Sequence, residues 1–257
     1  MASYSVNVAS DTLRQPAGNL TFSFARPLDM SRGVWEVALL QLGCWWSFYN
    51  VSATSYNNTR FSFSDGTTSY TVTLRDGVYS AIDLIEIIFA SIQGLTSTTV
   101  ADSIVLSISQ ATLGFTLQLS NGCTLDLSAG GTSNLYVLFG FAPINYTTQN
   151  VLIYSPGQAD ITSGQNVLNV RAPGLVSSNT VNGQQSNVLF SFSPNSAPGS
   201  LLSYTPTSPI WSEVPNQVLS SLTLQITDQA GRIVDFNNGA DFSNNGSAFT
   251  LVFRERR

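Results

Sequence analysis

The sequence predicts an all-β protein, a β-sandwich with one buried helix, and two observations carry this prediction. Almost every apolar segment is short, alternates with a period of two residues and ends at a turn signal, as Tyr4–Val8 and Leu20–Phe24 do. One segment, 80–93, has helical spacing instead. Many short strands separated by turns are typical of two sheets packed face to face.

Strands are expected wherever the alternation is clear. Further strands are predicted over 34–42, 44–52, 60–64, 69–74, 103–109, 149–154, 167–171, 187–193, 200–205, 221–227 and 247–253. The strongest turn signal is Asn121-Gly122, because this pair accepts the positive φ angles of a two-residue hairpin turn. We therefore predict a hairpin between Phe115–Leu119 and Cys123–Leu127.

The helix over 80–93 has its own start and stop signals. Ser80 is a good N-cap, Asp83 completes a capping box three residues later, and Gly94 fits the position after the last turn. The expected buried stripe consists of Ile82, Ile85, Phe89 and Ile92. Asp83 and Glu86 together also have the composition of a catalytic carboxylate pair, but capping and solvation explain both.

Composition excludes most familiar catalytic chemistry. The chain has 257 residues, 43% of them hydrophobic and 10% charged, and its ten basic residues are all arginine, with no lysine and no histidine. Without histidine there is no Ser-His or Cys-His nucleophile and no histidine-bound zinc, and without lysine there is no Schiff base. We therefore expect no enzyme, no catalytic or metal-binding residues and no cofactor.

The number and distribution of charged residues indicate which kinds of partner the protein can bind. Soluble domains carry about 25% charged residues, so a surface this poor in charge favours packing against other protein. The net charge of -5 and a pI of about 4.5 argue against a general nucleic-acid binder. Arg254, Arg256 and Arg257 are the exception, since they could touch a phosphate or an acidic neighbour, although a frayed, solvated tail is the simpler expectation.

The two cysteines and the lengths of the apolar runs indicate which metal, redox and membrane features the chain lacks. Cys44 and Cys123 are 79 positions apart, which fits neither a zinc site nor a redox pair, so both are expected to be buried, reduced thiols. No apolar run approaches the roughly 18 residues of a membrane span, and the first residues lack a basic and apolar leader. We expect no membrane span and no secretory signal.

The chain is interpreted as one domain over residues 1–257 with an insertion or excursion at about 142–186. There the composition shifts to Asn, Gln, Ser, Thr and Gly, with Pro143, Pro156 and Pro173 scattered through it. Strand-like segments at 151–154 and 167–170 indicate ordered structure that projects from the sandwich.

Two local clusters are candidate sites. The segment 235–241 offers two carboxylates and two amides, which could bind Ca²⁺, although its spacing fails the EF-hand pattern and a turn at Asn238-Gly239 explains it equally well. Trp45, Trp46, Phe48 and Tyr49 form the most unusual feature. Because neighbouring strand residues point to opposite faces, one tryptophan should enter the core and the other should be covered by a loop, the insertion or another subunit. A platform for carbohydrate is a third reading.

Several stretches together carry a resemblance. The segments 34–39, 45–50, 75–80, 138–141 and 222–236 are similar to elements of the minor capsid (penton) proteins of Polinton-like and adintovirus-like, virophage-related DNA viruses. They are short motifs spread over most of the chain.

The resemblance implies a jelly-roll protein of the virion without catalytic residues. It would form homopentamers at the fivefold vertices of an icosahedral capsid whose major protein is a double jelly roll, and the C-terminal arginines would contact the shell interior or a neighbouring subunit. Three alternatives stay open: a carbohydrate-binding β-sandwich such as a viral spike or lectin, a single jelly-roll major capsid subunit, and a hydrolase that uses only carboxylates.

Overall fold

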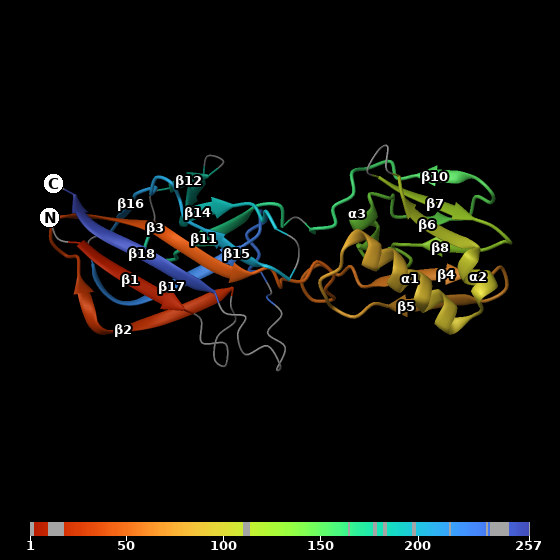
Figure 1. Ribbon diagram of the computed structural model, residues 1–257, viewed down its shortest axis with the longest axis horizontal. Coiled ribbons are helices and arrows are strands. Elements are labelled where there is room, and N and C mark those ends of the chain that lie inside the picture. Colours follow the sequence, from red (N-terminus) through yellow and green to blue (C-terminus); the bar gives the residue numbers. More distant parts are fainter. Residues whose placement is uncertain are drawn as a thin grey trace. The chain divides into compact units, whose positions relative to one another are not determined.

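The chain folds into two compact units. The computed structural model describes residues 3–9, 18–109, 114–163, 165–176, 179–181, 184–196, 199–215, 217–234, 236 and 247–256. Unit 1 consists of Met1–Phe48 and Gly164–Arg257, and unit 2 is the continuous segment Tyr49–Ser163 (Figure 1). Unit 2 is therefore inserted between two halves of unit 1.

Unit 1 contains two antiparallel sheets. Sheet I has the order β1 (Ser3–Ala9), β18 (Ala248–Arg256), β3 (Val34–Trp45) and β15 (Leu201–Tyr204), and β16 (Ser212–Val214) also pairs with β3. Sheet II has the order β14 (Val188–Phe192), β11 (Leu168–Arg171), β17 (Val218–Thr227) and β2 (Asn19–Asp29). A small hairpin joins β12 (Asn179–Val181) to β13 (Gln184–Ser186).

The path of the chain through these sheets is that of a jelly roll. It passes from sheet I to sheet II and back as β1, β2 and β3, and it enters sheet II with β11 and β14. It then returns to sheet I with β15 and β16, crosses to sheet II with β17 and ends in sheet I with β18. Alternating residues such as Phe249, Leu251 and Phe253 of β18 enter the core between the sheets. The predicted all-β jelly roll is confirmed.

Unit 2 has its own pair of sheets and its own core. Sheet III has the order β5 (Ser69–Thr73), β4 (Arg60–Ser64), β8 (Thr124–Asp126) and β9 (Asn145–Tyr146), and sheet IV the order β10 (Leu152–Tyr154), β7 (Phe115–Leu119) and β6 (Ile104–Ile108). The described helices α1 (Ala81–Leu95), α2 (Thr98–Asp102) and α3 (Leu135–Phe139) all belong to unit 2. Among the described residues, its apolar cluster shares no residue with that of unit 1.

The predicted helix is α1, and its start is confirmed in detail. Ser80 caps it, and both hydrogen bonds of the Ser80–Asp83 capping box are present. Two details differ from the prediction. The fully buried stripe is Leu84, Ile88 and Ile92, whereas Ile82 is 61% exposed. Gly94 lies inside the helix, which ends at Leu95, and Thr96 is the C-cap, whose hydroxyl and N–H both donate to the carbonyl of Ile92.

The predicted hairpin at Asn121-Gly122 is wrong, although the turn itself is there. Asn121 and Gly122 have φ angles of 55° and 78°, as the sequence requires. The strands on either side separate, however: β7 lies between β6 and β10 in sheet IV, and β8 lies between β4 and β9 in sheet III. The turn is a corner that carries the chain from one sheet to the other.

Most other strands lie where alternation predicts them, and one does not. The expected strand over 44–52 is wrong, because β3 continues to Trp45 and the following residues form only isolated bridges at Phe48 and Val51. The segment 142–186 is divided between the units, with β9 and β10 in unit 2 and β11 in unit 1. The interpretation as one domain stays a prediction.

Candidate functional site

The aromatic segment after β3 does not form one exposed platform. The ladder with β15 continues past the strand, since the N–H of Trp46 donates to the carbonyl of Ser200 (2.9 Å) and the N–H of Gly199 to that of Trp46 (2.8 Å). Trp46 packs on the unit 1 core and stacks on Phe48, with ring centroids 5.7 Å apart. Phe48 is 1% exposed and meets Phe236 edge to face. Phe48 is therefore a core residue, and Trp46 is a partly buried residue that packs against the core.

The remaining two aromatics lie elsewhere. Cys44 is fully buried, so Trp45 beside it lies on the outer face of sheet I, where it is partly exposed. Its cross-strand partner on β15 is Leu201, which is 53% exposed. Tyr49 belongs to unit 2. The four predicted aromatics therefore divide among the core, the outer face of sheet I and the start of unit 2.

The C-terminal arginines are part of sheet I as far as the structure describes them. Arg254 lies opposite Glu36 in the pairing of β18 with β3, and its Nε and Nη2 contact Glu36 Oε2 at 2.8 and 2.7 Å. Its guanidinium carbon lies 3.6 Å from the ring centroid of Trp211. Arg256 lies farther from the carboxylate of Glu36 than Arg254 does, with Nη1 3.8 Å from Glu36 Oε1. The expected frayed tail is wrong through Arg256, and Arg257 lies outside the described residues.

Glu36 contacts both described C-terminal arginines, and we call Glu36, Arg254 and Arg256 the Glu36 cluster. The side chain of Glu36 is only 12% exposed, against 36% for Arg254 and 62% for Arg256. A carboxylate withdrawn from water in this way needs charged partners, and the two arginines supply them. The sequence signal was present, since Glu36 is the one charged residue in the strand Val34–Trp45, but its partners are remote in the chain.

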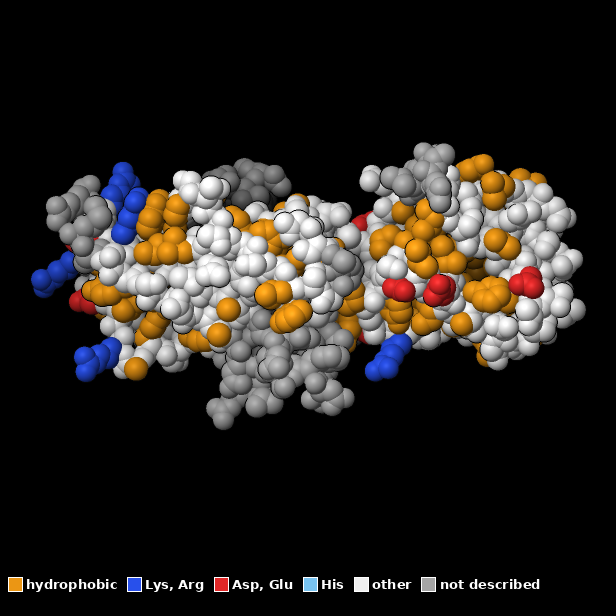
Figure 2. Space-filling view, in the orientation of Figure 1, with side chains coloured by type: hydrophobic (Ala, Val, Ile, Leu, Met, Phe, Trp, Pro, Cys, Tyr) orange, Lys and Arg blue, Asp and Glu red, His pale blue; other side chains and the backbone are white. Residues whose placement is uncertain are grey.

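Charge on sheet I is confined to one end of its strands. The charged residues within its strands are Glu36, Glu213, Arg254, Glu255 and Arg256, and the registers place Glu213 and Arg254 opposite Glu36. Among the described residues on the face of unit 1 shown in Figure 2, charged side chains likewise gather at the end where the termini lie, and hydrophobic and uncharged polar groups lie beyond it. Most of the described part of this face is therefore uncharged.

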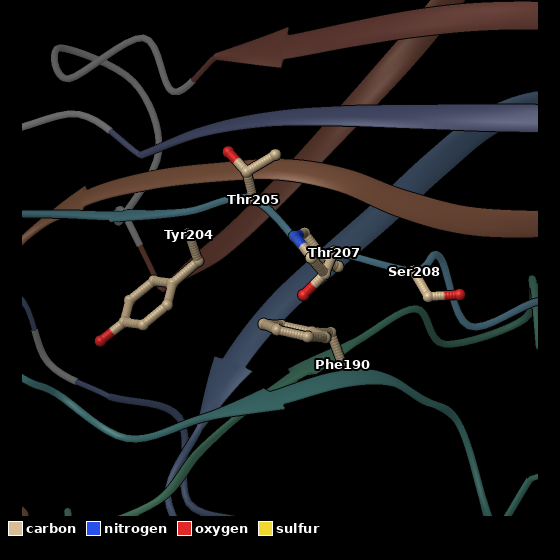
Figure 3. Close-up of a pocket in the computed structure, with 6 residues that line it drawn as sticks. Phe190, Tyr204, Thr205, Thr207 and Ser208 are labelled. Atoms are coloured by element: carbon tan, nitrogen blue, oxygen red, sulfur yellow. The ribbon is translucent and has the colours of Figure 1, made fainter.

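Unit 1 also contains an open pocket that sequence reasoning missed. It has a volume of about 380 Å³ and is lined by Phe190, Tyr204, Thr205, Pro206, Thr207 and Ser208. Phe190 comes from β14, and the other residues come from the end of β15 and the connection to β16. In Figure 3 Thr207 lies over the ring of Phe190 with the ring of Tyr204 beside them, while Thr205 points away.

Tyr204 is held in place by its phenol group. The hydroxyl donates to the carbonyl of Ser193 at 2.5 Å, and the ring packs against Phe192 with centroids 4.6 Å apart. Burial raises the pKa of Tyr204, so the phenol stays neutral at physiological pH. No local sequence signal marks this pocket, because it forms only when β14 and the segment after β15 come together.

Other chemical sites are few among the described residues. No group of three or more acids and cysteines gathers there that could hold a metal ion, and no described helix is long and apolar enough to cross a membrane. Cys44 and Cys123 are free and buried, as predicted, and burial raises the pKa of Cys44 to about 12. The candidate calcium segment 235–241 lies outside the described residues, apart from Phe236.

Comparison with known proteins supports the fold through structure alone. No protein-family model matches the chain, and none of the curated proteins is significantly similar to it. A crystal structure of the mavirus penton protein matches with a TM-score of 0.53 and 7% sequence identity, covering 99% of this chain and 100% of that one. The chain has the fold of a virophage penton protein.

A second match agrees with this penton fold. A chain from the cryo-electron microscopy structure of the Sputnik virophage aligns with a TM-score of 0.50 and 11% identity, covering 98% of each chain. Both matches extend over unit 1 and unit 2. At these identities the likeness concerns the fold, and at that level the resemblance predicted from short motifs is confirmed.

Proposed function

We propose that this chain is a structural protein of a virion, a minor capsid (penton) protein that forms homopentamers at the fivefold vertices of an icosahedral capsid. The observation that carries the proposal is the match to the mavirus penton protein, which covers both chains almost from end to end and includes the inserted unit 2. A match confined to the jelly roll would have supported any protein with that common fold.

The surface of unit 1 suits lateral packing in a closed ring. A ring of identical subunits needs two different contact faces on each chain, and the sandwich offers the outer faces of sheets I and II. Sheet I is uncharged away from the end that holds Glu36, and on sheet II the strands β14 and β17 carry no charged residue, whereas β2 and β11 do. The uncharged parts of both faces can be buried without leaving charges unpaired.

The outer face of sheet I supplies an apolar anchor for such contacts. Trp45 and Leu201 are cross-strand neighbours there, and large, partly exposed apolar side chains are typical centres of protein interfaces. Trp45 is therefore the member of the predicted aromatic cluster that serves as an interface residue.

The C-terminal arginines differ in whether they bind within their own chain or are available to a partner. Arg254 is held by Glu36 and Trp211 inside its own chain. Arg256, at 62% exposure, and Arg257 are the candidates for contact with the shell interior, with a double jelly-roll major capsid protein or, more weakly, with nucleic acid. Deleting the tail would shorten β18, so the matched test is the double substitution Arg256→Ala and Arg257→Ala.

The experiment that tests the proposal is native mass spectrometry with light scattering over a range of protein and salt concentration. A homopentamer has a mass of about 138 kDa, five chains of 27.6 kDa. Because the proposed faces are uncharged, the pentamer should persist at high salt. A discrete oligomer of another order would contradict the proposal, and so would a chain that stays monomeric both alone and with the major capsid protein of its particle.

The number of copies in the particle separates the penton from a single jelly-roll major capsid subunit. Five copies at each of the twelve vertices of an icosahedron are expected for a penton, whereas a major capsid subunit would be present in large excess over that number. Quantitative mass spectrometry of purified particles measures this ratio directly.

A further inference from the structure

From the pocket between β14 and the segment after β15, we infer that unit 1 carries a binding site for a neutral sugar. The inference does not rest on pentamer formation. It rests on the combination of two aromatic rings, free hydroxyl groups and an uncharged lining in one pocket of about 380 Å³ (Figure 3). Pockets that hold small molecules start at roughly 300 Å³, so the volume suits one sugar ring.

The aromatic rings provide the apolar contact. A pyranose ring has a face of C–H groups, and this face stacks on an aromatic ring, whose surface is electron-rich. Phe190 is only partly buried, and its ring lines the pocket. Tyr204 is fixed by its hydrogen bond to Ser193, so the second ring loses little conformational freedom when a ligand binds.

The hydroxyl groups provide the polar contact. Thr207 and Ser208 are exposed, and within the described part of the chain the structure gives neither hydroxyl a hydrogen-bond partner. Each can donate one hydrogen bond and accept two, as the hydroxyls of a sugar do. The rim of a sugar ring and the rim of the pocket therefore offer the same kind of group.

The absence of charge selects among ligands. None of the six lining residues is ionisable near neutral pH, since Tyr204 stays protonated. An anionic ligand such as sialic acid or a phosphate would find no cationic partner among the lining residues. The pocket therefore favours neutral sugars over acidic ones.

The proposed sugar site is separate from Trp45 and Trp46, the residues first considered as a platform for carbohydrate. Phe48 lies in the core of unit 1 and Trp46 packs against that core, so the two rings form no exposed platform, and the cross-strand neighbour of Trp45 is the apolar Leu201. The pocket brings two aromatic rings and hydroxyl groups together in its lining.

Saturation-transfer NMR on the full chain tests the inference. The probes are free glucose, galactose, mannose, fucose and N-acetylglucosamine at millimolar concentration, with sialic acid as the charged comparison. We expect at least one neutral sugar to give a signal and sialic acid to give none. Phe190→Leu keeps an apolar side chain in the sandwich but removes the aromatic face, and Thr207→Val removes one hydroxyl at nearly constant volume.

Each variant should weaken binding by about fivefold to tenfold, the effect of losing one neutral hydrogen bond or one stacking contact. Thr73→Val, at an exposed position of β5 in unit 2, is the matched control and should leave binding unchanged. Thermal unfolding confirms that each variant is folded.

Several results would overturn the inference. They are the absence of a signal from every neutral sugar, a signal from sialic acid alone, and a neutral-sugar signal that Phe190→Leu and Thr207→Val leave unchanged in folded protein. Loss of pentamers in these two variants with no sugar signal in the parent would assign the pocket to a segment of a neighbouring chain instead.

Discussion

Asn50 Nδ2 donates a hydrogen bond to the carbonyl oxygen of Ile161, 111 residues away, and another to that of Tyr79, each at 2.7 Å. Asn50 Oδ1 accepts a third from the N–H of Tyr79, and the main-chain carbonyl of Asn50 accepts from Ser163 Oγ at 2.6 Å. One buried amide thus ties the beginning of unit 2 to its end. An inserted unit with joined ends can fold without imposing a long open loop on its host.

Asn50→Ala should destabilise unit 2. The substitution removes three hydrogen bonds of a side chain that is 6% exposed and leaves buried main-chain groups without partners. We expect a loss of about 2–4 kcal/mol in the free energy of unfolding, measured by far-ultraviolet circular dichroism in urea. The control is Asn145→Ala, an exposed asparagine of β9, which should change it by less than about 0.5 kcal/mol.

The two units should report their unfolding through different signals. All four tryptophans of the sequence lie in unit 1, and all described helices lie in unit 2. Because the two described cores share no residue, Asn50→Ala should shift the helical dichroism transition more than the tryptophan fluorescence transition. Coincident shifts in both signals would instead support the interpretation of the chain as one cooperative domain.

Arg254→Ala should destabilise unit 1 far more than Arg256→Ala. Arg254 makes two contacts below 3 Å with a carboxylate that is mostly withdrawn from water, whereas Arg256 approaches the same carboxylate to 3.8 Å from an exposed position. We expect about 2 kcal/mol for Arg254 and less than about 0.5 kcal/mol for Arg256 in fluorescence-detected urea unfolding. Equal, small effects would show that Glu36 does not depend on Arg254.

Leu201→Glu should block assembly without unfolding the chain. Leu201 is exposed beside Trp45 on the uncharged part of sheet I, so a carboxylate there would be buried without a partner in a lateral contact. We expect a monomer by native mass spectrometry with an unchanged fluorescence midpoint. Val105→Glu on β6 of unit 2 introduces the same charge at a similarly exposed apolar residue and should leave the oligomer intact.

Local sequence patterns predicted strands and caps because both depend on neighbouring residues. The Ser80–Asp83 box and the positive φ of Asn121-Gly122 follow from side chains and backbone preferences within a few residues. Pairing depends on distant partners instead. The prediction of the Asn-Gly turn is therefore confirmed, whereas the predicted hairpin is wrong, because β7 and β8 pair with other strands in separate sheets.

In the candidate site, too, local sequence patterns predicted local features but not contacts between distant segments. Alternation predicted that Trp45 and its neighbour would face opposite ways, and they do. It could not indicate which one enters the core, because the bulged pairing of β18 with β3 resets the inward positions along the strand. The Glu36–Arg254 pair and the pocket at Phe190 both join segments far apart in the sequence, and no local pattern reveals them.

Stability should be insensitive to pH near neutrality and fall in acid. The chain has no histidine, the side chain that normally titrates between about pH 5 and 8. The Asp65 carboxylate accepts hydrogen bonds from the N–H of Thr68 (2.7 Å) and from the hydroxyl and the N–H of Thr67 (2.8 Å each), and these bonds lower its pKa to about 2, the Thr68 bond most. Hydrogen bonds from Ser80, the main-chain N–H first, likewise lower the pKa of Asp83.

Because these folded-state pKa values lie below the unfolded value of about 3.9, both carboxylates stabilise the fold above about pH 4, and that stabilisation is lost as the pH falls through the folded-state pKa, which is about 2 for Asp65. The urea midpoint of the dichroism transition should therefore be level from about pH 5 to 8 and drop below about pH 4. Asp65→Asn should lower the midpoint at pH 7 but not at pH 2, whereas Asp102→Asn, at the end of α2, should change neither. A midpoint difference between Asp65→Asn and the parent that stayed constant with pH would show that the Asp65 charge contributes nothing.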